Sequence, residues 1–227
     1  MVAKIAVLIP AYNESKTIGE VVKRTRKAAR GIDVLVVDDG SKDNTAGLAK
    51  KAGAGVIRHE INKGKAQAMI TGMNKLKKFD WVVFLDADLQ YEPEEIVKFL
   101  EAIKRDGADF ILGYRSFSDI PHFRHWAANV LMSLIFNVCY GANIRDLTCG
   151  LRAIKMSLWN KTNLIFSGYL VETEMVYDAA KLGARIQQLR VGVKYHSKSG
   201  VSRGVKIVAS ILIHTLFWKV FGKRRIF

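Results

Sequence analysis

The chain has 227 residues, of which 49% are hydrophobic and 25% are charged, and this composition excludes an intrinsically disordered protein. Its 36 lysines and arginines outnumber 21 aspartates and glutamates, and the formal net charge of +15 favours anionic partners such as nucleic acid, anionic lipid headgroups or phosphorylated substrates. The two cysteines, Cys139 and Cys149, form neither a CxxC pair nor a disulfide framework.

The first half of the chain alternates apolar strands with amphipathic helices. We predict strands at 5–10, 32–37, 56–57, 81–85 and 109–112, and helices at 15–30, 44–53, 64–78 and 94–105. The run at 5–10 is short and ends at Pro10, so we expect a first strand rather than a signal peptide. Because the strands show little polar alternation, the pattern predicts an α/β, doubly wound fold, with a mostly parallel sheet flanked by helices.

Two apolar stretches, 122–140 and 207–221, stand out in the second half. Their unbroken apolar pieces fall short of the roughly 20 residues that a membrane-spanning helix needs. Basic residues flank or punctuate the second stretch: Lys206, Lys219, Lys223, Arg224 and Arg225. Apolar bulk with basic edges favours amphipathic helices lying in the interfacial plane of a membrane. A core helix or a subunit interface is the alternative.

Two aspartates directly follow the predicted strand at 81–85. In extended chain, residues two apart point the same way, so the carboxylates of Asp86 and Asp88 should converge. Hard oxygen ligands at a strand end suit Mg²⁺ or Mn²⁺ bridged to phosphates of a substrate. Gln90 could add an oxygen or a water contact. A solvated acidic turn is the alternative.

Further polar residues fall at the ends of other strands, where ligands bind in parallel sheets. Asp39 is placed to accept hydrogen bonds from a ribose or a base edge, while Asp43 or Asn44 should cap the next helix. The turn at 62–65 contains a glycine and precedes a helix, so its backbone amides are expected to face an anion. A solvated turn is the alternative there.

Basic residues after the fifth strand are candidates for phosphate recognition. Arg115 and Arg124 lie near the first apolar stretch, and the segment 196–203 is polar, basic and glycine-containing. Arginine is the preferred partner of phosphate oxygens because its fork is planar and bidentate. A loop of this composition could close over phosphates, although a basic surface loop is equally compatible with it.

Eight motifs occur in order through nearly the whole chain: IPAYNES at 9–15, VVDDGSKDNT at 36–45, NKGKAQA at 62–68, DADLQYEPE at 86–94, GYRSFSD at 113–119, DLTCGLRA at 146–153, GYLVETEM at 168–175 and KSGVSR at 198–203. This ordered set resembles family 2 glycosyltransferases with the GT-A fold. The resemblance extends to the dolichyl- or polyprenyl-phosphate sugar synthases, such as dolichol-phosphate mannose synthase.

The resemblance implies roles for individual residues. Pro10, Tyr12, Glu14 and Asp39 would hold the nucleoside, and Asp86, Asp88 and Gln90 would hold Mg²⁺ or Mn²⁺. Phosphates of donor and acceptor would contact Lys65, Arg115, Arg124 and the loop with Lys198, Ser202 and Arg203. Asp146 and Glu172 would line the sugar side. The catalytic set implied in this way is Asp86, Asp88, Arg115, Asp146 and Glu172.

The chain departs from the family pattern in three places. Cys149 replaces a common serine, the basic loop has lysine and arginine in exchanged order, and clear membrane-spanning helices of some relatives have no counterpart here. We therefore expect one glycosyltransferase domain over 1–227. Residues 1–115 would form the nucleotide-sugar half, 116–203 the acceptor half, and 204–227 an amphipathic membrane-interface helix.

The expected reaction moves a hexose from a nucleotide-diphospho-sugar, of GDP-mannose or UDP-glucose type, to a lipid phosphate with inversion. A lipid phosphate is largely ionised near neutral pH, so positioning and the metal would carry catalysis without a strong base. A hydroxyl of a polysaccharide, glycolipid or protein is the alternative acceptor, and Asp146 or Glu172 would then be the base.

The expected partners follow from this chemistry. The enzyme would be peripheral (monotopic) at the cytoplasmic face of a membrane, with a membrane protein or a second copy as a possible further partner. A nucleic-acid-binding module is disfavoured, because no such motif appears and acidic strand ends would repel a phosphate backbone. A catalytically silent scaffold is disfavoured by the intact D-x-D motif.

Overall fold

The structure is a computed structural model that describes residues 3–116, 123–165, 170–194 and 201–223. Within the helices it leaves out the side chains at 123–126 and 201–207. Of the predicted site residues, Lys198 lies outside the described residues, and the side chains of Arg124, Ser202 and Arg203 lie outside the described side chains.

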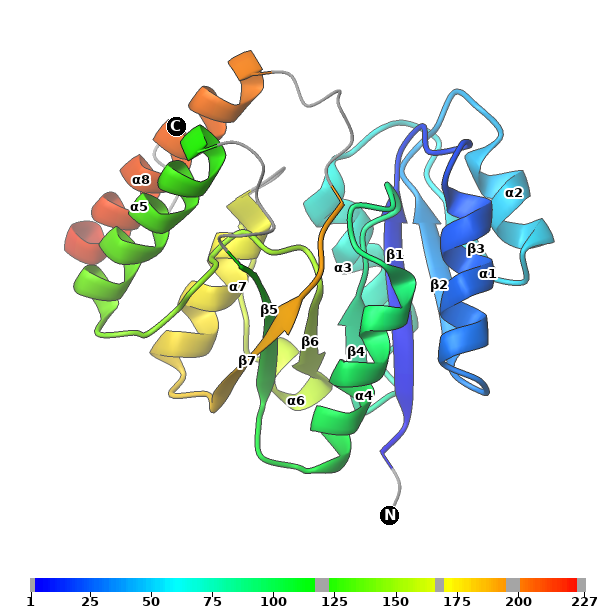
Figure 1. The fold of residues 1–227 in the computed structure, drawn as a ribbon, viewed down its shortest axis with the longest axis horizontal. Coiled ribbons are helices and arrows are strands. Elements are labelled where there is room, and N and C mark those ends of the chain that lie inside the picture. The colour runs from blue at the N-terminus through cyan, green and yellow to red at the C-terminus, as the bar shows by residue number, and fades with distance from the viewer. Residues whose placement is uncertain (1–2, 117–122, 166–169, 195–200, 224–227) are drawn as a thin grey trace.

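The described residues form a seven-stranded sheet in the order β3-β2-β1-β4-β6-β5-β7 (Figure 1). The strands are β1 (Ile5–Ala11), β2 (Asp33–Asp38), β3 (Gly55–Arg58), β4 (Trp81–Phe84), β5 (Phe110–Arg115), β6 (Arg152–Lys155) and β7 (Ile186–Val191). Only β6 runs antiparallel to its neighbours within this sheet. The predicted α/β fold with a mostly parallel sheet is therefore confirmed.

Helices cover both faces of the sheet because successive strand residues point to opposite sides. Val7 and Ile9 of β1 face a layer with α1 (Ile18–Ala28), α2 (Thr45–Lys51), η1 (Pro93–Glu95) and α4 (Ile96–Lys104). Ala6 and Leu8 face α3 (Lys65–Lys75), α6 (Met156–Trp159) and α7 (Leu170–Lys181). The sheet is thus buried on both faces, as the unbroken apolar strands predict.

The register of the strands brings three strand ends to one edge of the sheet. Ala11 at the end of β1 lies beside Asp38 at the end of β2, and Leu8 of β1 lies beside Phe84 at the end of β4. The chain segments that follow β1, β2 and β4 therefore emerge side by side. These segments carry the acidic motifs predicted to bind a ligand.

The second half differs from the first because its strands carry polar residues. β6 contains Arg152, which is fully buried and donates to the carbonyl oxygens of Cys149 and Glu172. β7 contains two glutamines, Gln187 and Gln188, and is only half-buried. These two strands lack the apolar run that indicates a buried strand, and they were not predicted from the sequence. The helices α6 and α7 were not predicted either.

The helices α5 (Phe123–Tyr140) and α8 (Val201–Phe221) pack side by side at one end of the molecule (Figure 1). Phe136, Ile211 and Trp218 are buried in the core. Large apolar side chains on the same two helices are exposed: Val130, Leu131, Leu134, Val138, Ile213, Leu216, Val220 and Phe221. In the parts of the chain that are described, no helix combines the length and hydrophobicity needed to cross a membrane.

The end of α8 is anchored to α7 by a buried lysine. Lys223 Nζ lies 3.1 Å from Glu174 Oε1 and 2.7 Å from Asp178 Oδ2, and it donates to the carbonyl oxygen of Asn163. Trp218 packs edge-on against Tyr177 of α7. The C-terminal helix is therefore part of the folded core as well as a carrier of exposed apolar residues.

Candidate active site

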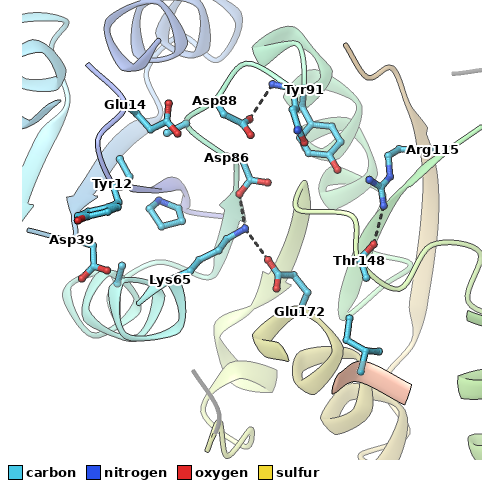
Figure 2. Close-up of a pocket in the computed structure, with 16 residues that line it drawn as sticks. Tyr12, Glu14, Asp39, Lys65, Asp86, Asp88, Tyr91, Arg115, Thr148 and Glu172 are labelled. Carbon is cyan, nitrogen blue, oxygen red and sulfur yellow. Dashed lines mark hydrogen bonds and ion pairs between the residues drawn. The ribbon is translucent and has the colours of Figure 1, made fainter. Parts of the chain in front are cut away.

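A pocket of about 410 Å³ lies at the edge of the sheet where β1, β2 and β4 end (Figure 2). Ten of the predicted site residues line it: Pro10, Tyr12, Glu14, Asp39, Lys65, Asp86, Asp88, Gln90, Arg115 and Glu172. Tyr91, Thr148 and Ile211 also line it, together with three alanines. Tyr91, Thr148 and Ile211 are not among the predicted site residues, although Tyr91 lies in the motif at 86–94 and Thr148 in the motif at 146–153.

A lysine joins two carboxylates across the centre of the pocket. Lys65 Nζ, in the first turn of α3, lies 2.6 Å from Asp86 Oδ1 and 2.7 Å from Glu172 Oε1 (Figure 2). Burial alone would lower the pKa of Lys65, but the negative charges of Asp86 and Glu172 outweigh it and raise the pKa. Lys65 therefore stays protonated and provides a permanent positive charge in the middle of the site.

The Asp86 carboxylate can occupy its position because the neighbouring residue, Gly150, has no side chain. A Cβ added to Gly150 would lie 1.9 Å from Asp86 Oδ2, so any other residue would displace this carboxylate. Gly150 donates its backbone N–H to the hydroxyl of Tyr91 at 3.3 Å. Burial raises the pKa of Tyr91, which keeps this hydroxyl neutral.

The turn after β4 presents Asp88 to the pocket. Leu89 has a φ of 60°, a left-handed conformation that is costly for a leucine and is often found at functional sites. Asp88 Oδ1 accepts the N–H of Gln90 at 3.0 Å. Burial, with Asp86 nearby, raises the pKa of Asp88, and burial likewise raises the pKa of Glu14.

These residues fit a divalent cation that would be bound partly by the protein and partly by the phosphate oxygens of a bound diphosphate. Mg²⁺ is typically held by one or two carboxylates plus substrate phosphates rather than by an all-protein cage. Asp86 and Asp88 supply such carboxylates, and crowded acidic groups whose pKa values are raised are relieved by a bound cation. No cluster of three or more histidine, cysteine, aspartate or glutamate ligands exists among the described residues.

Asp39 is held by protein donors at the edge of the pocket. Its Oδ1 accepts the N–H of Lys63 at 2.9 Å, its Oδ2 accepts the N–H of Gly64 at 2.7 Å, and its Oδ1 lies 2.7 Å from His59 Nδ1. The amides of Lys63 and Gly64 were expected to face an anionic ligand. They bind Asp39 instead, because its carboxylate is the nearest anion.

Asp146 differs from the expectation that it lines the sugar side. Its side chain is fully buried behind Arg115, with Arg115 Nε 2.6 Å from Oδ2 and Nη2 2.9 Å from Oδ1. Burial by itself would raise the pKa of Asp146, but the Arg115 guanidinium outweighs it and lowers the pKa. Arg115, which also donates to Thr148 Oγ1 at 2.8 Å, is the partner that faces the pocket. Asp146 therefore holds Arg115 and does not itself line the pocket.

The buried Arg115–Asp146 pair predicts a pH-dependent loss of stability. We expect Asp146→Asn to lower the free energy of unfolding by about 3 kcal/mol near neutral pH, because it leaves the guanidinium without its counter-charge. The folded pKa of Asp146 lies below the unfolded value of about 3.9, so this contribution is present above that pH and is lost on acidification. Urea unfolding from pH 7 to pH 3 should show the gap between the two proteins narrowing.

The matched control for that measurement is Asp109→Asn. Asp109 forms a similar two-bond pair with Arg185, but Arg185 is exposed, so the loss of stability at pH 7 should be much smaller. Equal unfolding curves for wild type and Asp146→Asn at pH 7 would show that the buried pair does not matter for stability.

The chain is similar in sequence to several known proteins. The chain is 37% identical over 207 residues to an uncharacterized protein of Methanocaldococcus jannaschii, covering 85% of this chain and 89% of the relative. It is 31% identical to the glycosyltransferase AglJ of Haloferax volcanii, covering 80% of this chain and 60% of AglJ. It is 34% identical to the undecaprenyl-phosphate 4-deoxy-4-formamido-L-arabinose transferase of Edwardsiella ictaluri, covering 68% of this chain and 50% of that protein.

The fold also matches a solved structure. The crystal structure of glucosyl-3-phosphoglycerate synthase from Mycobacterium tuberculosis, in complex with Mn²⁺, uridine diphosphate and phosphoglyceric acid, aligns with a TM-score of 0.81. The alignment covers 98% of this chain and 80% of that one at 23% identity, so it establishes the shared fold. The family model described as glycosyl transferase family 2 matches residues 6–161, and the chain belongs to that family.

Proposed function

We propose that this glycosyltransferase moves a hexose from a nucleotide-diphospho-sugar to a dolichyl or polyprenyl phosphate at a membrane surface, with inversion at the anomeric carbon. The observation that carries the proposal is the position of α8. Ile211 of α8 lines the pocket, while Ile213, Leu216 and Val220 of the same helix are exposed. One helix thus connects the site of chemistry with an apolar surface. The similarity to the undecaprenyl-phosphate transferase named above supports a lipid-phosphate acceptor, and the match covers half of that protein's length.

The nucleotide side of the pocket is assigned to residues of the first half. Tyr12 and Pro10 offer flat apolar surfaces to a base, and Asp39 offers a fixed acceptor to the nucleoside. Asp86 and Asp88, with Gln90 close by, would hold Mg²⁺ or Mn²⁺ beside the diphosphate. When bound, the metal stabilises the negative charge of the departing nucleoside diphosphate.

The cations of the pocket have complementary tasks. Lys65 lies between the metal-site carboxylate Asp86 and the sugar-side carboxylate Glu172, so it can shift its contacts toward a diphosphate oxygen. Arg115 is held by Asp146 and Thr148, which orients its guanidinium for a phosphate. Arg124 and the loop residues Lys198, Ser202 and Arg203 are proposed to assist with the phosphates of donor and acceptor.

The acceptor decides whether a base is needed. A lipid phosphate is a ready nucleophile, so residues 116–203 need only hold it in line with the donor. A hydroxyl acceptor of a polysaccharide, glycolipid or protein needs a general base, and Glu172 is the carboxylate placed for it. Glu172 already binds Lys65, which favours the ionised phosphate as nucleophile.

The direct test is transfer of label from a panel of nucleotide sugars to defined acceptors. We expect a GDP- or UDP-hexose to label polyprenyl phosphate, giving a product that is stable to mild base, sensitive to mild acid and opposite in anomeric configuration to the donor. Polyprenol without phosphate is the matched control and should remain unlabelled, because it lacks the ionised nucleophile. Labelling of a hydroxyl acceptor with none of the lipid phosphate would establish the alternative.

The carboxylates at the end of β4 predict metal dependence. Chelation should abolish transfer, and Mg²⁺ or Mn²⁺ should restore it. Asp88→Asn should cost several kcal/mol of transition-state stabilisation. Gly150→Ala should lower kcat/KM by about 100-fold or more, because its Cβ displaces the Asp86 carboxylate.

Gly19→Ala is the matched control for the glycine variant. In the described part of the chain nothing lies within 4 Å of a Cβ at Gly19, which sits in α1, so activity should be unchanged. Undiminished transfer by Asp88→Asn in the presence of chelator would remove the metal from the mechanism.

The exposed apolar residues of α5 and α8 predict attachment to a membrane surface. Deleting α8 is a poor test, because it also removes Ile211, Trp218 and Lys223 from the core. We expect the fourfold variant Leu134→Ser, Val138→Ser, Leu216→Ser and Val220→Ser to bind anionic vesicles about tenfold or more weakly, because less apolar area enters the interface. High salt should weaken the remaining, electrostatic part of the binding.

Vesicle flotation and nucleotide titration measure the two sides of this prediction separately. The fourfold variant should bind nucleotide normally and transfer sugar to lipid poorly. The control variant Val97→Ser with Leu182→Ser removes exposed apolar residues from α4 and the end of α7, and it should float like wild type. Normal flotation and lipid transfer by the fourfold variant would assign the paired helices to another contact.

A further inference from the structure

A buried histidine stands between the predicted nucleoside site and helix α3. His59 directly follows β3 and is only 8% exposed. Its Nδ1 lies 2.7 Å from Asp39 Oδ1, and its Nε2 lies 3.0 Å from Thr71 Oγ1. No motif of the sequence analysis includes His59 or Thr71, and the proposed function assigns neither of them a task.

The hydrogen bonds around Asp39 leave it one acceptor position. An ionised carboxylate has about four lone-pair sites and donates nothing. Among the described residues, Oδ1 accepts from Lys63 N and faces His59 Nδ1, while Oδ2 accepts from Gly64 N. The remaining site is on Oδ2 of a side chain that lines the pocket. Asp39 therefore has room for one N–H or O–H donor of a ligand.

The proton positions on His59 follow from its neighbours. Since the Asp39 carboxylate can only accept, Nδ1 must carry a hydrogen. Nε2 lies within hydrogen-bond distance of the Thr71 hydroxyl, which can donate or accept. Thr71 belongs to α3, whose first residue is Lys65. The imidazole thus joins the end of β2, the end of β3 and the helix that carries the central cation.

The backbone amides alone would not fix the carboxylate as firmly. Lys63 and Gly64 lie in the turn before α3, and Gly64 has a φ of 90° that depends on glycine. His59 approaches Asp39 from a different element and is itself held at its far nitrogen. Two independent supports prevent the carboxylate from rotating its free lone pair away from the pocket.

We propose that His59 is a positioning residue for donor recognition, which holds Asp39 so that its one unfilled acceptor site meets a single N–H or O–H of the nucleoside. The inference rests on the proposed function, because it takes the ligand beside Asp39 to be the nucleoside of the donor. It identifies the Thr71–His59–Asp39 chain as a determinant of the KM for the donor rather than of the chemical step.

The test is a double-mutant cycle on nucleotide affinity. Titration calorimetry with UDP and with GDP, each with Mn²⁺, is carried out on wild type, His59→Leu, Asp39→Asn and the double variant. We expect His59→Leu to weaken the preferred nucleotide by about tenfold, as the loss of a hydrogen bond to a charged group does. In the Asp39→Asn background the same change should have little further effect, because His59 acts through Asp39.

Kinetics separate positioning from a merely structural role. His59→Leu should raise the KM for the nucleotide sugar about tenfold and leave kcat at saturating donor within about twofold of wild type. His59→Asn should restore part of the affinity, since its amide N–H can take the place of Nδ1. Thr71→Val keeps the imidazole and removes only the hydroxyl that holds it, so the loss of nucleotide affinity should be smaller. This variant replaces His59→Leu in the test if His59→Leu does not fold.

Three results would overturn the inference. The first is unchanged nucleotide affinity in a folded His59→Leu or Thr71→Val protein. The second is a double variant whose loss of nucleotide affinity equals the product of the losses from His59→Leu and Asp39→Asn. The third is a lower kcat of His59→Leu with an unchanged KM for the nucleotide sugar. Failure of the wild type to bind either nucleotide would instead overturn the proposed function, and the inference with it.

Discussion

The arrangement of the site depends on the half-buried cation at its centre. Asp86 and Glu172 compensate the charge of Lys65, and the lysine in turn holds these two carboxylates near each other. Asp86 follows β4, whereas Glu172 lies in the first turn of α7, much later in the chain. The ion pairs of Lys65 therefore join two distant segments of the chain inside the pocket.

Much of the first half could be predicted from sequence, whereas in the second half only the helices at the two apolar stretches could. Apolar runs such as 34–37 and 81–84 are unambiguous because both faces of the strand are buried. The acidic motifs end those strands, so their convergence on one pocket follows from parallel topology. β6 begins with the buried Arg152, which donates to the carbonyl oxygen of Cys149, three residues earlier, and to that of Glu172 in α7. The contact with Glu172 forms only in the folded chain and leaves no local signal in the sequence.

The same limit explains why Asp146 was expected to line the pocket but does not. A motif indicates that a carboxylate belongs near a site but not which way it points, and here the Arg115 side chain stands between Asp146 and the pocket. His59 was overlooked for a related reason, because one histidine after a strand acquires its meaning only when Asp39 and Thr71 are brought to either side of it. Ile211 joins the pocket from almost the far end of the chain, which makes the surface helix α8 a wall of the site.

The central claim is that the carboxylates after β4 receive a metal-bound nucleoside diphosphate. X-ray diffraction from crystals grown with Mn²⁺ and UDP or GDP, recorded where manganese scatters anomalously, tests it most directly. The account predicts an anomalous peak beside Asp86 and Asp88, with the base against Tyr12 and one nucleoside donor on Asp39. A nucleotide bound outside this pocket, or bound inside it with manganese held by other residues, would contradict the account.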